Sequence, residues 1–89
     1  MIQRQVDIIN KLGLHARAAA KLVDCAGRFG CRIQLHKDGD SVDAKSIMAV
    51  MMLAAGQGTQ LLLCCDGEDE QAACDAIETL ISDRFGEPE

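Results

Sequence analysis

The segment NKLGLHARAAAKLV, residues 10–23, contains the side chains best suited to chemistry in this sequence. His15 and Arg17 stand where the pattern predicts the start of a helix, and the first N–H groups of a helix have no intrahelical partner. Those groups attract an anion together with the helix dipole. A neutral imidazole at His15 could therefore attack a phosphorus atom. The new phosphoryl group would lie against the guanidinium of Arg17 and the backbone N–H groups of Ala16, Arg17 and Ala18.

The spacing of these residues allows a second interpretation. A histidine at the start of a helix is commonly a capping or turn residue without chemistry of its own. An enzyme of the acyl-transfer type would need a base and an orienting group beside the nucleophile, and no local pattern supplies them. From the residues alone, nucleophile and cap both stand as hypotheses for His15.

A second candidate region is the apolar run IMAVMML, which follows Ser46. Ser46 can cap a short helix over this run. A single helix of a small domain cannot bury every face, and the expected inward set is Val50, Leu53 and Ala54. The expected outward set is Ile47, Met48 and Met51. Exposed methionine-rich surface suits docking of several partners, although packing of this set under a neighbouring loop would explain the same pattern.

The composition limits which other functions are available. Residues 1–89 form one domain, with 48% hydrophobic residues and five cysteines. The odd cysteine count, the absence of a CxxC pair and the adjacent Cys64 and Cys65 argue against a disulfide framework and against zinc. We expect reduced, buried cysteines and no metal or cofactor.

The charge distribution argues against a nucleic-acid partner. The formal net charge is −5, made up of +3 over residues 1–65 and −8 over residues 66–89. A mildly basic front suits a phosphate or an acidic protein partner, while a solvated acidic helix equally explains the C-terminal block. No run approaches the roughly 20 apolar residues of a membrane span. The N-terminus lacks the apolar core of a signal peptide, so we expect a cytoplasmic protein with no membrane contact.

The elements that must position these side chains follow from hydrophobic periodicity. Period-2 alternation predicts strands over residues 2–8 and 31–37, and Asp38-Gly39 signals a hairpin to a return strand over 41–44. An apolar strand is expected over 59–65. Helices are expected from Ala16 to about Gly27, after Ser46, and from about residue 68 to Phe85.

The predicted order is βαββαβα. It indicates an α+β fold, a two-layer open-faced sandwich with a four-stranded antiparallel sheet and three helices on one face. The first helix is expected to bury Ala19, Leu22, Val23 and Ala26. The last is expected to bury Ala72, Ala73, Ala76, Ile77, Leu80 and Ile81.

Four motifs in combination carry a family resemblance. GLHARAA, then AKSIM about thirty residues on, then QGT and GEDEQA resemble the HPr family, the histidine-containing phosphocarriers of the bacterial phosphoenolpyruvate-dependent phosphotransferase system. The resemblance covers essentially the whole chain, and the family fold agrees with the independent prediction. The segments NKLGLHAR and SIMAVMMLAAGQG are most similar to the nitrogen-related (NPr) branch, with the sugar branch as the near alternative.

The resemblance implies a carrier rather than an enzyme. His15 would accept a phosphoryl group on Nδ1 from phosphorylated enzyme I and pass it to an enzyme IIA, with Arg17 orienting the phosphate. Ser46 matches the position that HPr kinase/phosphorylase modifies in some bacteria. The implied docking surface comprises Ala20, Ile47, Met48 and Met51. We expect a monomer.

One residue departs from the family pattern. The motif usually has proline where this chain has Ala18, and proline in the first helical turn is preorganised and brings no N–H. Alanine should still allow the helix because it is the best helix former. An alternative function, a regulatory module of the same fold that acts by docking, remains open, but such a binder has no need of a nucleophile at His15.

Overall fold

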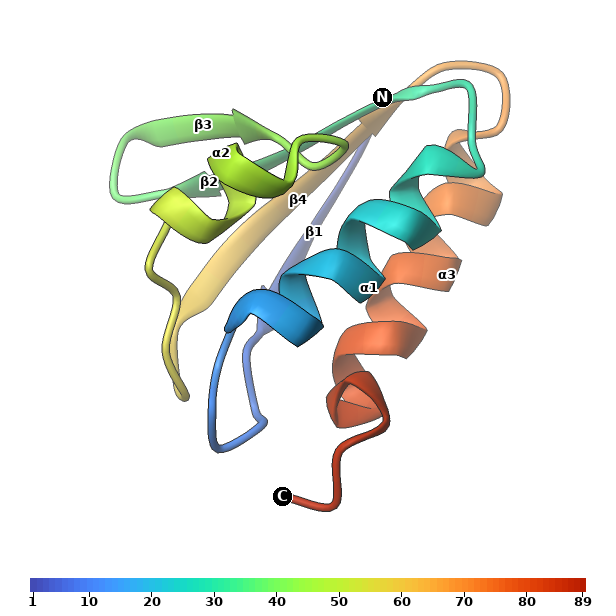
Figure 1. The fold of residues 1–89 in the computed structure, drawn as a ribbon. Coiled ribbons are helices and arrows are strands. Elements are labelled where there is room, and N and C mark those ends of the chain that lie inside the picture. Colours follow the sequence, from blue (N-terminus) through green and yellow to red (C-terminus); the bar gives the residue numbers. More distant parts are fainter.

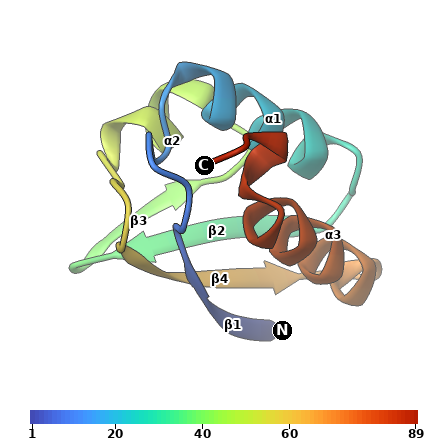
Figure 2. The same cartoon turned by 90° about the horizontal axis from the view of Figure 1, so that it is seen from below.

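The computed structural model describes residues 1–89 and confirms the predicted βαββαβα order. The three helices lie together on one side of the sheet and leave its other face open (Figure 1; Figure 2). A short 3₁₀ turn, η1, follows the last helix. In chain order the elements are β1 (Ile2–Asp7), α1 (Ala16–Gly27), β2 (Arg32–Lys37), β3 (Asp40–Asp43), α2 (Ile47–Met52), β4 (Gln60–Asp66), α3 (Glu70–Ser82) and η1 (Arg84–Gly86).

The sheet has the strand order β1-β4-β2-β3, with every neighbouring pair antiparallel. The predicted hairpin joins β2 to β3. Asp38 and Gly39 have φ angles of 50° and 87°, the left-handed conformation that a two-residue hairpin turn needs. This turn pairs Lys37 with Asp40, so β3 begins one residue before the predicted start at residue 41.

The core forms between the covered face of the sheet and the helices, as a cluster of 22 buried residues. The predicted strand alternation is confirmed in β2, where Ile33 and Leu35 are buried. In α1, Val23 is only partly buried, whereas Ala18 is fully buried. In α3 the predicted burial of Ala72 is wrong, because Ala72 is exposed, and the predicted Ala76 and Leu80 are only partly buried. The buried stripe of α3 consists of Ala73, Cys74, Ile77 and Ile81.

The C-terminal end differs most from the prediction. Helix α3 ends at Ser82 instead of continuing to Phe85. Arg84 and Phe85 both have a φ of 55°, which turns the chain out of the helix and buries the ring of Phe85 in the core. Residues 84–89, here called the C-terminal tail, then reach the loop between β1 and α1, where the Lys11 N–H donates to the backbone oxygen of Glu89 at 3.0 Å.

The five cysteines are free thiols, four of them buried and Cys25 partly buried. Burial, together with the neighbouring Cys74, raises the pKa of Cys65. Such thiols behave as small hydrophobic side chains rather than as nucleophiles. No group of three or more His, Cys, Asp or Glu side chains is arranged to hold a metal ion. No helix has both the length and the apolar character needed to cross a membrane.

Candidate functional site

His15 is the N-cap residue of α1, with an extended backbone at φ −71° and ψ 175°, yet its side chain makes no capping hydrogen bond. The side-chain capping hypothesis is therefore wrong. The preceding turn is set by Gly13, whose φ is +67° and where a Cβ would lie 2.6 Å from the carbonyl oxygen of Ala55. The next residue anchors the chain, because the Leu14 N–H donates to that same carbonyl at 2.8 Å.

The start of α1 presents backbone donors without intrahelical partners. The first hydrogen bond of the helix runs from the N–H of Ala19 to the carbonyl of His15, at 2.8 Å. The N–H groups of Ala16, Arg17 and Ala18 precede it and have no helical acceptor. This is the arrangement that the sequence predicted beside the imidazole.

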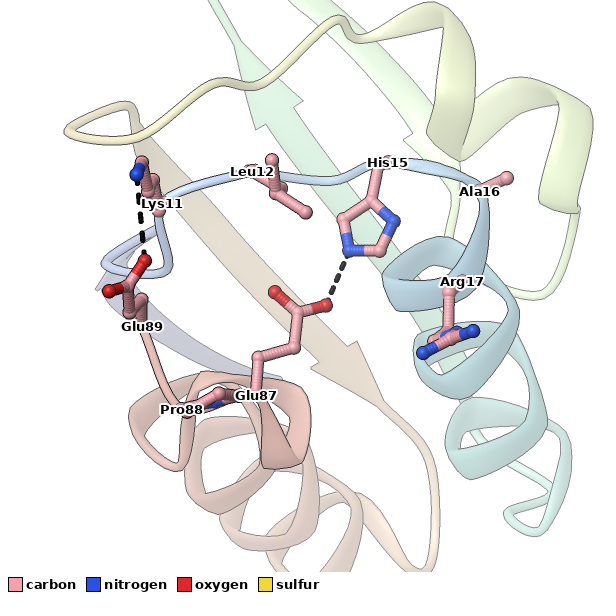
Figure 3. Close-up of a pocket in the computed structure, with 8 residues that line it drawn as sticks. All are labelled: Lys11, Leu12, His15, Ala16, Arg17, Glu87, Pro88 and Glu89. Atoms are coloured by element: carbon pink, nitrogen blue, oxygen red, sulfur yellow. Dashed lines mark hydrogen bonds and ion pairs between the residues drawn. The ribbon is translucent and has the colours of Figure 1, made fainter.

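The imidazole of His15 is held by the C-terminal tail. Its Nε2 bonds to Oε2 of Glu87, and Oε1 of Glu87 accepts a 3.0 Å hydrogen bond from Nδ2 of Asn10. These bonds, that from His15 foremost, lower the pKa of Glu87 below its ordinary value. Nδ1 lies on the other side of the ring, toward the first turn of α1, and has no protein partner (Figure 3).

A pocket surrounds His15 at this junction. Arg17 is exposed and forms no ion pair or side-chain hydrogen bond with the rest of the chain, whereas Lys11 pairs with Glu89 at 3.5 Å. The free guanidinium therefore remains available to an incoming anion. The pocket is lined by Lys11, Leu12, His15, Ala16, Arg17, Glu87, Pro88 and Glu89 (Figure 3).

The sequence interpretation missed two residues of this site, Asn10 and Glu87. Asn10 is fully buried, and its Nδ2 also donates to the carbonyl of Gly13 at 2.8 Å. Glu87 lies 72 residues from His15, and no local periodicity links them. A buried polar residue needs a hydrogen-bond partner, but the sequence does not show which residue that partner is.

Ser46 caps α2 as predicted, its Oγ accepting a hydrogen bond from the Ala49 N–H at 3.4 Å. Val50 and Leu53 are buried. Ala54, expected to face inward, is instead exposed with a φ of 51°, and Ala55 is buried in its place. The helix ends at Met52, and the left-handed residue Ala54, two positions later, turns the chain so that its own side chain points outward.

The methionine-rich patch of α2, defined as Ile47, Met48 and Met51, is open to solvent. Its members are 39%, 69% and 41% exposed, so the hypothesis that a loop covers them is wrong. Met52, which was not predicted, is exposed as well, and so is Ala20 on α1. Helix α1 and helix α2 contact each other, so the patch and the His15 site belong to neighbouring elements.

The architecture and the site define a small carrier-type protein, with one histidine at an open helix start rather than an enclosed catalytic cavity. Comparisons with known proteins agree. A family model described as "PTS HPr component phosphorylation site" matches residues 2–83. The phosphocarrier protein HPr of Cupriavidus necator is 58% identical over 89 residues, covering 100% of both chains. The phosphocarrier protein HPr of Pseudomonas aeruginosa is 57% identical over 86 residues, covering 96% of each.

Solved structures show the same similarity. A crystal structure of HPr from Thermoanaerobacter tengcongensis superposes with a TM-score of 0.97 at 43% identity, covering all of both chains. HPr from Bacillus anthracis gives a TM-score of 0.84 at 41% identity, covering 88% of this chain and 93% of that one. The chain belongs to the HPr family, and it is a phosphocarrier of the phosphotransferase system rather than a catalytic enzyme.

Proposed function

We propose that His15 is the residue that carries the phosphoryl group, on Nδ1. The observation that supports this most directly is the unpartnered Nδ1 beside three backbone N–H groups that lack helical acceptors. Arg17, exposed and unpaired, adds a guanidinium that can bind phosphate oxygens in a bidentate manner. His36, the other histidine, lies in β2, away from any helix start.

The proposed transfer is a balanced exchange between histidines. The Nδ1 lone pair attacks the phosphorus of a phosphohistidine on enzyme I, one N–P bond forms as the other breaks, and the donor imidazole leaves. In the second transfer His15 is the donor: a histidine of an enzyme IIA attacks the phosphorus, and the N–P bond to Nδ1 breaks. The N–H groups of Ala16, Arg17 and Ala18 and the Arg17 side chain stabilise the phosphoryl charge throughout.

The test is incubation with enzyme I and labelled phosphoenolpyruvate. We expect an acid-labile, base-stable label on the wild type and none on His15→Ala. His36→Ala is the matched control, since it removes the other imidazole and should keep the label. Label retained on His15→Ala would contradict the assignment. A wild type that takes no label from a competent enzyme I would instead favour the docking module.

We further propose that the methionine-rich patch and Ala20 form the docking surface for enzyme I, enzyme IIA and an HPr kinase/phosphorylase. Exposed apolar side chains on α2 support this because they expose surface that a partner can bury. Phosphate on Ser46 would suit the start of α2 but place negative charge at the edge of that surface. Ser46→Asp should therefore slow uptake from enzyme I, and an unchanged rate would contradict the inhibitory role.

We propose a cytoplasmic monomer that is most similar to the nitrogen-related branch, supported by the resemblance of the segments around His15 and α2 to that branch. The branch is tested by offering the phosphorylated protein to a nitrogen-related and to a sugar-specific enzyme IIA. Faster transfer to the sugar-specific acceptor would contradict it. Sedimentation equilibrium tests the monomer.

A further inference from the structure

We propose that Glu87 is a positioning residue for phosphoryl transfer: it holds the proton of His15 on Nε2 and so leaves the lone pair on Nδ1. This inference rests on the proposed role of His15. Glu87 belongs to the C-terminal tail, which lies beyond residues 2–83, the part of the chain that the family model matches.

The hydrogen-bonding capacity of Glu87 and His15 decides which ring nitrogen carries the proton. An ionised carboxylate can only accept hydrogen bonds. Because Oε2 of Glu87 faces Nε2 of His15, that nitrogen must be the one that carries the proton. A neutral imidazole has a single N–H, so its other nitrogen, Nδ1, is left as the nucleophile.

The carboxylate of Glu87 cannot easily turn away from His15. Its other oxygen, Oε1, accepts from Nδ2 of Asn10, and that amide is fixed in turn by donating to the carbonyl of Gly13. Asn10 is fully buried and Glu87 is 14% exposed in its side chain. The Asn10 amide therefore orients Glu87, and Glu87 orients His15.

The C-terminal tail is anchored on both sides of Glu87. Before it, the Phe85 ring is buried and its carbonyl accepts a 2.6 Å hydrogen bond from Lys21 Nζ. After it, Glu89 bonds to Lys11 through both backbone and side chain. An anchored tail loses little entropy when it orders the imidazole, which favours a preorganised nucleophile.

The chemistry follows from this geometry. When Nδ1 attacks phosphorus, the ring gains positive charge, and the proton stays on Nε2. The Glu87 carboxylate stabilises that charge through the bond it already makes, so no proton has to move during the step.

The decisive variant is Glu87→Gln, which keeps the shape of the side chain. If its carbonyl oxygen stays on Asn10, its NH₂ group faces Nε2 and favours the wrong tautomer, with the proton on Nδ1. If it turns round, its NH₂ group meets the NH₂ of Asn10 and a hydrogen bond is lost. Glu87→Ala removes the acceptor without adding a donor. Asp83→Asn is the matched control, since it removes one exposed negative charge just before the tail without touching the pocket.

The measurements are the tautomer of His15, from ¹⁵N NMR of the imidazole nitrogens, and the rate of uptake from phosphorylated enzyme I. We expect Glu87→Gln to increase the fraction with the proton on Nδ1 and to slow uptake about tenfold, an effect typical of lost outer-shell partners. Glu87→Ala should lie between, and Asp83→Asn should match the wild type. A wild-type tautomer and rate in Glu87→Gln, with label still on His15, would overturn the role of Glu87 alone. Label surviving in His15→Ala would instead overturn the proposed function.

Discussion

Helices α1 and α2 begin with the same backbone geometry but use their first residue in opposite ways. Both N-cap residues, His15 and Ser46, are extended. The Ser46 hydroxyl turns back onto the Ala49 N–H of its own helix. The His15 imidazole turns away from its helix and bonds to Glu87.

The difference separates a helix start that is capped by its own side chain from one that has no side-chain cap. A capping side chain satisfies one of the free N–H groups and stabilises the helix by about 1 kcal/mol. At α1 that stabilisation is absent, and the N–H groups of the exposed residues Ala16 and Arg17 stay available to an anion. Helix α3 shows a third arrangement, because the carboxylate of Asp69 accepts the N–H groups of Gly30 and Cys31, at 2.8 and 2.9 Å, instead of capping its own helix.

The largest expected effect concerns the guanidinium of Arg17, beside the uncapped start of α1. Arg17→Ala should slow phosphoryl uptake by about 10- to 100-fold, since a charge-assisted, bidentate donor is lost. The free energy of unfolding should change by less than about 0.5 kcal/mol, because Arg17 is exposed and unpaired. Quenched-flow labelling and urea denaturation measure the two quantities. Arg17→Lys should lie between, and a wild-type rate in Arg17→Ala would remove Arg17 from the site.

Exchanging cap residues tests the comparison directly. Ser46→Ala should destabilise the protein by about 1 kcal/mol, whereas His15→Ser should be about 1 kcal/mol more stable than His15→Ala, because serine adds the missing cap. Urea denaturation of the four proteins provides the values. Equal stabilities for His15→Ser and His15→Ala would show that the start of α1 cannot accept a side-chain cap.

The two helix starts should also differ in their response to pH. The pKa of Glu87 is lowered by His15 and then by Asn10, so its ionised form is favoured in the folded state. Its contribution to stability is complete above the ordinary glutamate pKa of about 4.3 and is lost as pH falls through the lowered value. The stability difference between wild type and Glu87→Gln should therefore decline in acid.

The start of α2 provides the matched control for this pH dependence. The hydrogen bond between Ser46 Oγ and the Ala49 N–H contains no ionisable group. The stability difference between wild type and Ser46→Ala should consequently stay constant over the same pH range. Parallel decline of both differences would mean that acid weakens the whole fold rather than the tail.

The smallest expected effect concerns the departure from the family motif. Ala18→Pro removes the third N–H donor at the start of α1 without breaking a helical hydrogen bond. Proline suits the first turn and restricts the unfolded chain, so stability should rise by about 0.5 kcal/mol. The phosphohistidine should hydrolyse about two- to threefold faster with one donor fewer. A loss of stability beyond about 2 kcal/mol would show that the buried site of Ala18 has no room for the ring.

Much of this molecule could be predicted because its signals are local. Alternating residues marked β1 and β2, Asp38-Gly39 marked the hairpin, and Ser46 marked the start of α2. The position of His15 at a helix start followed from the same short-range patterns. The exposure of the methionine-rich patch did not, because the sequence also allowed a loop to cover it, and the structure decided between the two. The local features depend on backbone periodicity and turn chemistry within a few residues, which a sequence shows directly.

The tertiary structure decided how His15 is held. Helix α3 ends at Ser82, and the left-handed turn at Arg84 and Phe85 that follows it buries the Phe85 ring in the core. That turn sends Glu87 across 72 residues of sequence to the imidazole, where Asn10 meets it. A hydrogen bond to a carboxylate over such a separation depends on where the whole chain packs, so the sequence determined the position of His15 at a helix start and only the fold determined its partner.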